Sequence, residues 1–213
     1  QGMEVTQVCS GKYGKNAHQD KKLLRREEEI ISILKSKTNE EIFIAGWKGT
    51  NENLSRNFYN LRGTNEYENS NIAVILGTSN IRPTTLKEIT AAIFYDETPV
   101  VFETTKEPVK YGMNVDGKDF ACKTLKAVDT RYDAIWSIYQ EAEIFQAVNR
   151  IRPYAKDITK IYLITSLPIR WLIPTQLMTM KELIGHLRRL DTIDICGDRE
   201  QGNIADLVQS TLW

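Results

Sequence analysis

Short apolar runs that end at a glycine or a polar loop recur along the chain. A run of this kind, flanked by turn residues, is typical of a strand that is buried on both faces of a parallel sheet. We expect such strands at residues 42–46, 72–76, 100–102 and 160–165, with a further short strand at 58–60.

Between these runs, apolar residues recur every three or four positions, which is the period of an α-helix. The pattern predicts helices at residues 20–37 and 84–94, from near residue 130 to just before Pro153, and at 177–190. In the helix before Pro153, the apolar stripe that we expect to face the core consists of Ile135, Ile138, Ala142, Phe145, Val148 and Ile151. Alternating strands and helices predict an α/β fold with a mainly parallel sheet flanked by helices.

The remaining segments divide the chain. Asp116-Gly117 stands between two alternating runs and predicts an inserted β-hairpin. Residues 1–19 contain glycine and lysine without apolar periodicity, so we expect a flexible lead, followed by one domain at 20–190 and an extension at 191–213. Gln1-Gly2-Met3 has the form of residues left ahead of a start methionine, so we expect a piece of a longer protein.

Composition excludes several classes of protein. The chain has 213 residues, 41% of them hydrophobic, and no apolar run approaches the roughly 18 residues that a membrane span needs. Its three cysteines are widely spaced, which favours a reducing cytoplasmic location over a disulfide framework. With two histidines and no paired cysteines, we expect no metal site. The net charge of zero means that any contact with nucleic acid must be local.

The end of the helix before Pro153 carries the first candidate chemistry. Gln146, Arg150 and Arg152 lie largely off the apolar stripe, and arginine's planar, always charged guanidinium suits phosphate. The alternative is a solvated helix face, where cations near the C-terminus are mildly favoured by the helix dipole.

A second stretch, from Asn60 to Asn80, joins a polar glycine loop to the apolar run at 72–76. Together the two stretches resemble motifs V and VI of the superfamily 2 helicases, which lie in the second RecA-like domain of those enzymes. Arg62, Gly63 and Asn65 match motif V. Gln146 and Arg150 match motif VI, whereas Asn149 stands where the family has glycine and Arg152 comes one residue early. The resemblance covers roughly residues 40 to 170.

The resemblance implies a domain that closes over ATP and Mg²⁺ held mainly by a first RecA-like domain, its partner in the enzyme. Arg150, or else Arg152, would be the arginine finger, with Gln146 beside it, and Gly63, Thr64 and Asn65 would contact the nucleotide. DNA or RNA would be held by Lys48, Thr50 and Arg62. The alternative for Arg62-Gly63 is a simple turn, and for Lys48 and Thr50 an exposed loop without a partner.

Other chemistry is weaker or missing. The sequence has no Gly-x-x-x-x-Gly-Lys-Ser/Thr loop, so we expect this chain alone not to hydrolyse ATP. Glu141 and Glu143, two residues apart on a helix, point in different directions and do not form an acid and base pair. Of the tryptophans and tyrosines, we consider stacking on bases only for Trp47 and Tyr59. The competing hypothesis is a nucleic-acid or protein binding module on the same fold, without nucleotide turnover.

Overall fold

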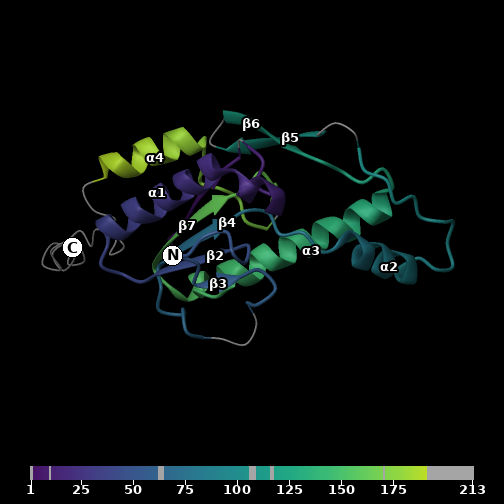
Figure 1. The fold of residues 1–213 in the computed structure, drawn as a ribbon, viewed down its shortest axis with the longest axis horizontal. Coiled ribbons are helices and arrows are strands. Elements are labelled where there is room, and N and C mark those ends of the chain that lie inside the picture. The colour runs from purple at the N-terminus through teal and green to yellow at the C-terminus, as the bar shows by residue number, and fades with distance from the viewer. Residues whose placement is uncertain are drawn as a thin grey trace, which may run out of the picture.

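The computed structural model describes residues 2–9, 11–61, 65–105, 109–115, 118–169 and 171–190, with the backbone alone for 109–115 and 118–124. These residues form a six-stranded parallel sheet flanked by four α-helices (Figure 1). The order across the sheet is β3-β2-β4-β7-β1-β8, and every neighbouring pair is parallel. The predicted α/β class with a mainly parallel sheet is therefore confirmed.

The strands of the sheet are β1 (Gly2–Val8), β2 (Ile42–Gly46), β3 (Arg56–Asn57), β4 (Ile72–Leu76), β7 (Ile158–Ile164) and β8 (Gln176–Met178). The helices are α1 (Lys21–Lys37), α2 (Pro83–Ile93), α3 (Thr130–Asn149) and α4 (Met180–Arg189), with 3₁₀ turns η1 (Lys15–Gln19) and η2 (Pro153–Ala155). All four predicted helices are present. The strand expected at 100–102 is absent from the described residues, where Thr104 and Ala127 form an isolated bridge instead.

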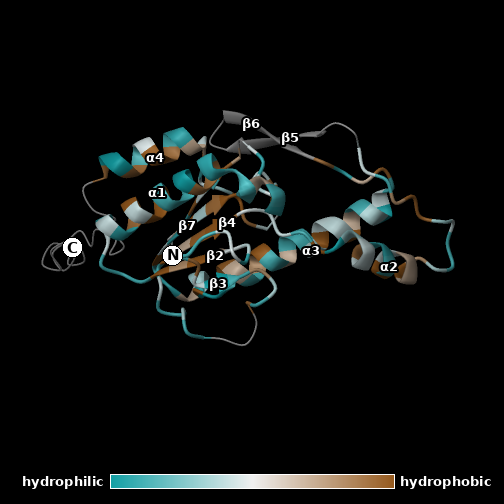
Figure 2. Cartoon of the chain, in the orientation of Figure 1, coloured by the Kyte–Doolittle hydropathy of each residue, from teal (hydrophilic) through white to brown (hydrophobic). Residues whose placement is uncertain are grey.

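Alternate residues of the central strands enter two different cores, because successive side chains of a strand point to opposite faces. Phe43, Ala73, Ile75 and Ile161 pack with Ile144, Ala147, Val148 and Ile151 of α3 and its C-terminal end. Ile42, Ile44, Val74 and Ile164 pack with α1 and α4 on the other face. In Figure 2 the central strands are accordingly brown, while α1 and α4 carry teal residues on the outside. Both faces of the sheet are thus covered.

The prediction of a flexible lead is wrong for most of residues 1–19. β1 is an interior strand, paired with β7 on one side and β8 on the other. The hydrophobic pattern does not predict β1, because the strand contains the polar residue Gln7. This side chain is nevertheless fully buried. The Gln7 amide Nε2 donates to the carbonyls of Thr165 (2.9 Å) and Leu167 (2.8 Å), so its nitrogen is hydrogen-bonded inside the core.

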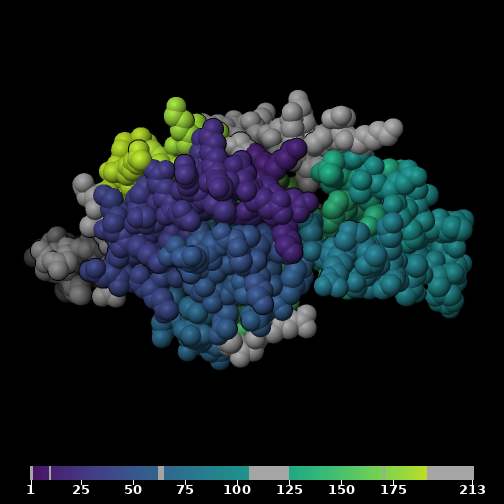
Figure 3. Space-filling view, in the orientation of Figure 1, coloured from purple at the N-terminus to yellow at the C-terminus, as the bar shows by residue number. Residues whose placement is uncertain are grey.

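The predicted core stripe of α3 is wrong at two positions. Ile138 is 60% and Phe145 45% exposed, whereas Gln140 and Glu143 are buried. The N-terminal half of α3 leaves the sheet and packs on α2 instead, in a small cluster around Leu86 and Tyr132. These elements form the lobe that stands out beside the sheet, drawn in teal in Figure 3.

Strands β5 (Val109–Val115) and β6 (Lys118–Thr124) pair antiparallel into a separate two-stranded sheet between α2 and α3 in sequence. The turn predicted at Asp116-Gly117 lies outside the described residues, as does the proposed extension at 191–213. Among the described helices, none is long and apolar enough to cross a membrane.

Candidate functional site

The segment around the stretch that begins at Asn60 contacts α3 and its C-terminal end at two points. The backbone N–H of Tyr59 donates to Oε2 of Glu143 at 2.8 Å. Nine residues further on, Glu68 forms an ion pair with Arg152 at 2.9 Å, just beyond the C-terminal end of α3. Arg62, Gly63 and Thr64 lie outside the described residues, but the chain on both sides of them is attached to α3 or its end.

Three polar residues share one side of α3. Gln146 and Arg150 follow Glu143 by three and seven positions, which places all three on the same side of an α-helix. Arg150 is the C-cap of α3 and is partly buried. Arg152 follows in the left-handed conformation, with φ of 49°, and its side chain is about half exposed. The helix end thus presents Gln146 and both arginines near the segment that precedes β4.

The other predicted contact residues are more scattered. Asn65 is exposed, and its carbonyl accepts the N–H of Glu68. Lys48 is exposed in the turn after β2, and the Thr50 hydroxyl donates to the carbonyl of Trp47 at 2.7 Å. The Thr50 hydroxyl proton is therefore committed to that turn. Lys48 and Thr50 lie at the carboxyl edge of the sheet, while Arg152 lies on the approach to the amino end of β7, so the structure does not bring them together.

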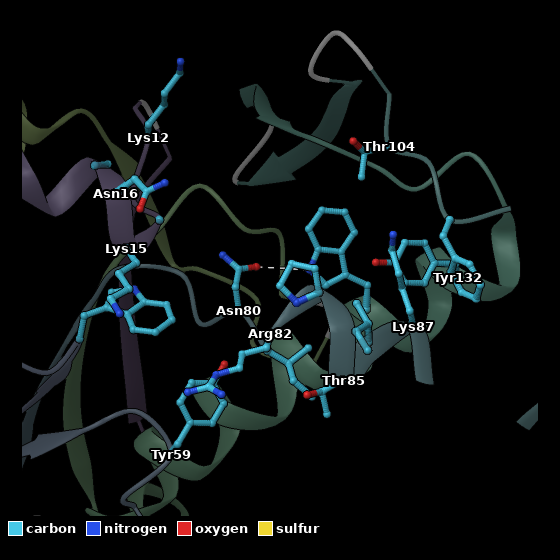
Figure 4. A pocket seen from close by; sticks show the side chains of 18 residues that line it. Lys12, Lys15, Asn16, Tyr59, Asn80, Arg82, Thr85, Lys87, Thr104 and Tyr132 are labelled. Carbon is cyan, nitrogen blue, oxygen red and sulfur yellow. Dashed lines mark hydrogen bonds between the residues drawn. The ribbon is translucent and has the colours of Figure 1, made fainter. Parts of the chain in front are cut away.

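A cavity of about 1210 Å³ lies at the carboxyl edge of the sheet. Loops that follow β1, β2, β3 and β4 supply one part of its lining, and α2 and α3 supply the other (Figure 4). Its most chemically distinctive residues are Lys12, Lys15, Asn16, Trp47, Tyr59, Asn80, Arg82, Lys87 and Trp136. Parallel α/β sheets commonly bind ligands at this edge.

Of these residues, sequence reasoning had singled out only Trp47 and Tyr59. The sequence does not indicate Lys12, Lys15 and Asn16, because residues 1–19 show no apolar periodicity. Asn80 and Arg82 follow directly after the clearest apolar run, at 72–76, so the rule that ligands bind beyond the carboxyl ends of strands could have found them.

The cavity has a positive lining. Lys12, Lys15, Arg82 and Lys87 are exposed, and the residues that line the cavity include no carboxylate. Within the described part of the chain, none of these four cations forms an ion pair. Lys15 lies over the Trp47 ring, with Nζ 5.9 Å from the centroid, and Lys87 lies 5.8 Å from the centroid of Phe102. The positive charge is therefore available to an anionic ligand.

Aromatic rings line two sides of the cavity. Trp47 and Tyr59 lie with ring centroids 6.1 Å apart, and the Ser79 hydroxyl donates to the Tyr59 phenol oxygen at 2.9 Å. Burial raises the pKa of Tyr59 above its ordinary value, so the phenol is neutral at physiological pH. Across the cavity, Trp136 of α3 donates its indole N–H to Oδ1 of Asn80 at 3.3 Å.

The loop after β1, which carries Lys12 and Lys15, is anchored from beneath. The Tyr13 carbonyl accepts the N–H of Thr78, and His18 is buried with Nδ1 3.0 Å from the Gly14 carbonyl and Nε2 3.0 Å from Oε1 of Glu27. Gly77 passes directly under this loop. The position of the two lysines thus depends on buried contacts with β4 and α1.

No family model, curated protein or solved structure matches the chain. Among the described residues, no group of three or more histidine, cysteine, aspartate or glutamate side chains is placed to hold a metal ion.

Proposed function

We propose that the chain is the second RecA-like domain of a superfamily 2 ATP-dependent helicase acting on DNA or RNA. The observation that carries the proposal is that the chain on both sides of the motif V-like residues contacts α3 or its end, through Tyr59 with Glu143 and Glu68 with Arg152. Residues that serve one nucleotide must converge, and Tyr59 and Glu143 are 84 residues apart in sequence.

In this proposal, a first RecA-like domain holds ATP and Mg²⁺, and this domain closes over them. Arg150 is the first candidate for the arginine finger and Arg152 the second, since a guanidinium stabilises the charge that develops on the transferred phosphoryl group. Gln146 lies on the same side of α3 and would orient groups at the phosphate. Gly63, Thr64 and Asn65 would contact the nucleotide.

Nucleic acid would run over the carboxyl edge of the sheet. Lys48 follows β2 there, beside Trp47, which lines the cationic cavity, and Thr50 holds the turn that carries Lys48. Arg62 remains a third candidate for the nucleic-acid backbone. Lysine and arginine side chains supply most of the non-specific affinity of proteins for nucleic-acid phosphates. We therefore expect the nucleic acid to bind along this edge.

The second candidate function is a nucleic-acid binding module without nucleotide turnover. It is favoured by one observation: the cationic and aromatic cavity is formed by this chain alone, whereas an ATP site would need residues that its sequence lacks.

The decisive experiment measures nucleic-acid-stimulated ATP hydrolysis by the protein that also contains the first domain. Arg150→Ala should lower kcat by about 10³-fold or more, the usual contribution of an arginine finger. Arg188→Ala, on the distant helix α4, is the matched control and should leave kcat unchanged. A protein that binds nucleic acid but hydrolyses no ATP would support the binding module. Equal rates for Arg150→Ala, Arg152→Ala and the control would refute the arginine-finger assignment.

A further inference from the structure

We propose that the cavity at the carboxyl edge holds an unstacked base of a single-stranded nucleic acid. The inference rests on the nucleic-acid part of the proposed function and adds that bases, as well as phosphates, are bound. The cavity would hold a nucleobase together with its attached phosphate. The size and charge of the cavity favour a nucleic-acid strand over a free nucleotide.

The cavity is larger than a pocket built for one small molecule. Its volume of about 1210 Å³ exceeds the roughly 300–1,000 Å³ typical of such pockets. Four cations line it, at Lys12, Lys15, Arg82 and Lys87, with no lining carboxylate to balance them. Repeated phosphates of one strand match this spread of charge.

The aromatic side chains explain why a base would enter. Tyr59 is 50% exposed although its neighbour Trp47 is buried, so one aromatic ring remains available at the wall of the cavity. Trp136 and Tyr132 of α3 stack with centroids 6.3 Å apart and line the opposite side. A base stacks on such rings whatever its sequence, because every base has a π face.

Asn80 supplies a polar contact at the floor of the cavity. The N–H groups of Trp136 and Gln140 both donate to its Oδ1, and only an oxygen can accept two donors. The amide nitrogen must therefore point the other way, toward the loop that carries Lys15 and Asn16 in Figure 4. Asn80 thus offers a donor to an acceptor atom of the base or its phosphate.

The test compares two labelled strands of 20 units by fluorescence anisotropy: oligothymidylate, and an abasic strand with the same phosphates. Oligothymidylate should bind about tenfold tighter, as expected for stacking of one base. Tyr59→Leu should remove this preference and leave the abasic affinity unchanged. Tyr59→Phe keeps the ring and should keep the preference. Tyr95→Leu, at a tyrosine that is 83% exposed away from the cavity, is the matched control. Thermal melts of each variant confirm folding.

Each alternative outcome has a distinct meaning. Equal affinity for the two strands, or equal weakening of both by Tyr59→Leu, overturns base binding while leaving nucleic-acid binding intact. Failure of both strands to bind refutes nucleic-acid binding itself, and the base site with it. If thymidine monophosphate binds as tightly as the strand, the cavity is a site for a free nucleotide, and the proposal that it holds a strand is overturned.

Discussion

Glu143 of α3 accepts the backbone N–H of Tyr59 at 2.8 Å, and Glu143 is itself buried. This bond fixes the point where the chain leaves the carboxyl edge of the sheet and turns back along α3. Tyr59 has φ of 66°, a conformation that costs a non-glycine residue of order 1–3 kcal/mol, so the surrounding contacts must hold it. Glu143 thereby links the cavity wall to the helix that ends in Arg150.

Glu143→Ala should destabilise the protein by about 1–3 kcal/mol, because it leaves the Tyr59 N–H without its acceptor in a partly buried site. Glu143→Gln retains an oxygen acceptor and should cost less. Chemical denaturation gives both values. A loss as small as that of Glu141→Ala, at a less buried neighbour on the same helix, would show that the bond does not hold the segment.

The variant Arg152→Gly tests separately the backbone strain at this position and the role of the side chain in ATP hydrolysis. Arg152 has φ of 49°, where glycine carries no steric cost, and its ion pair with Glu68 is exposed enough to contribute only about 0–1 kcal/mol. The melting temperature should therefore stay the same or rise slightly. Under the proposed helicase function, ATP hydrolysis retained in the presence of the proposed first domain would leave Arg150 as the candidate finger. Lost hydrolysis with an unchanged melting temperature would favour Arg152.

Much of the fold could be predicted from the hydrophobic pattern, because strands buried on both faces are nearly all apolar. β2 and β4 lie exactly where such runs occur, and α1 and α2 begin within a residue of their predicted starts. The pattern does not predict β1, because Gln7 interrupts the apolar run. The Gln7 side chain donates hydrogen bonds to carbonyls some 160 positions away. Hydrogen bonds between residues so far apart in the chain cannot be read from the local sequence.

The candidate site was only partly predictable for a similar reason. Arg150 and Asn65 belong to local patterns that a sequence can display. The cavity joins Lys15, Asn80 and Trp136 from three separate segments, and nothing in any one of them indicates the others. The burial of Gln140 likewise depends on Asn80, 60 positions earlier, which accepts its amide N–H.

Gly77→Ala should be strongly destabilising, because two costs add at this position. Its φ of 99° disfavours any side chain, and a Cβ would lie 2.7 Å from Cε1 of His18 and 2.8 Å from the Tyr13 carbonyl. We expect a loss of about 2–5 kcal/mol from strain and overpacking together. Gly49→Ala is the control: φ is 77° but no atom lies within 4 Å, so only the strain should appear. Equal losses in the two variants would contradict the clash.

The buried pair of His18 and Glu27 should make stability depend on pH near neutrality. The Gly14 carbonyl and an ionised Glu27 can only accept, so both ring nitrogens of His18 donate when the imidazole is charged. Burial alone would lower the pKa of His18, but the hydrogen bond and charge of Glu27, with the Gly14 carbonyl, more than offset it and raise the pKa above 6.5.

A group whose pKa is raised on folding contributes its full stability below the unfolded value, here 6.5, and loses it as the pH rises through the folded pKa. The free energy of unfolding should therefore fall as the pH is raised above about 6.5. Burial, above all, raises the pKa of nearby Tyr13 to about 12, which keeps that residue neutral across this range. His18→Gln should flatten the slope between pH 6 and 9 in denaturant titrations, whereas His186→Gln on α4 should not. A slope that persists in His18→Gln would place the titrating group elsewhere.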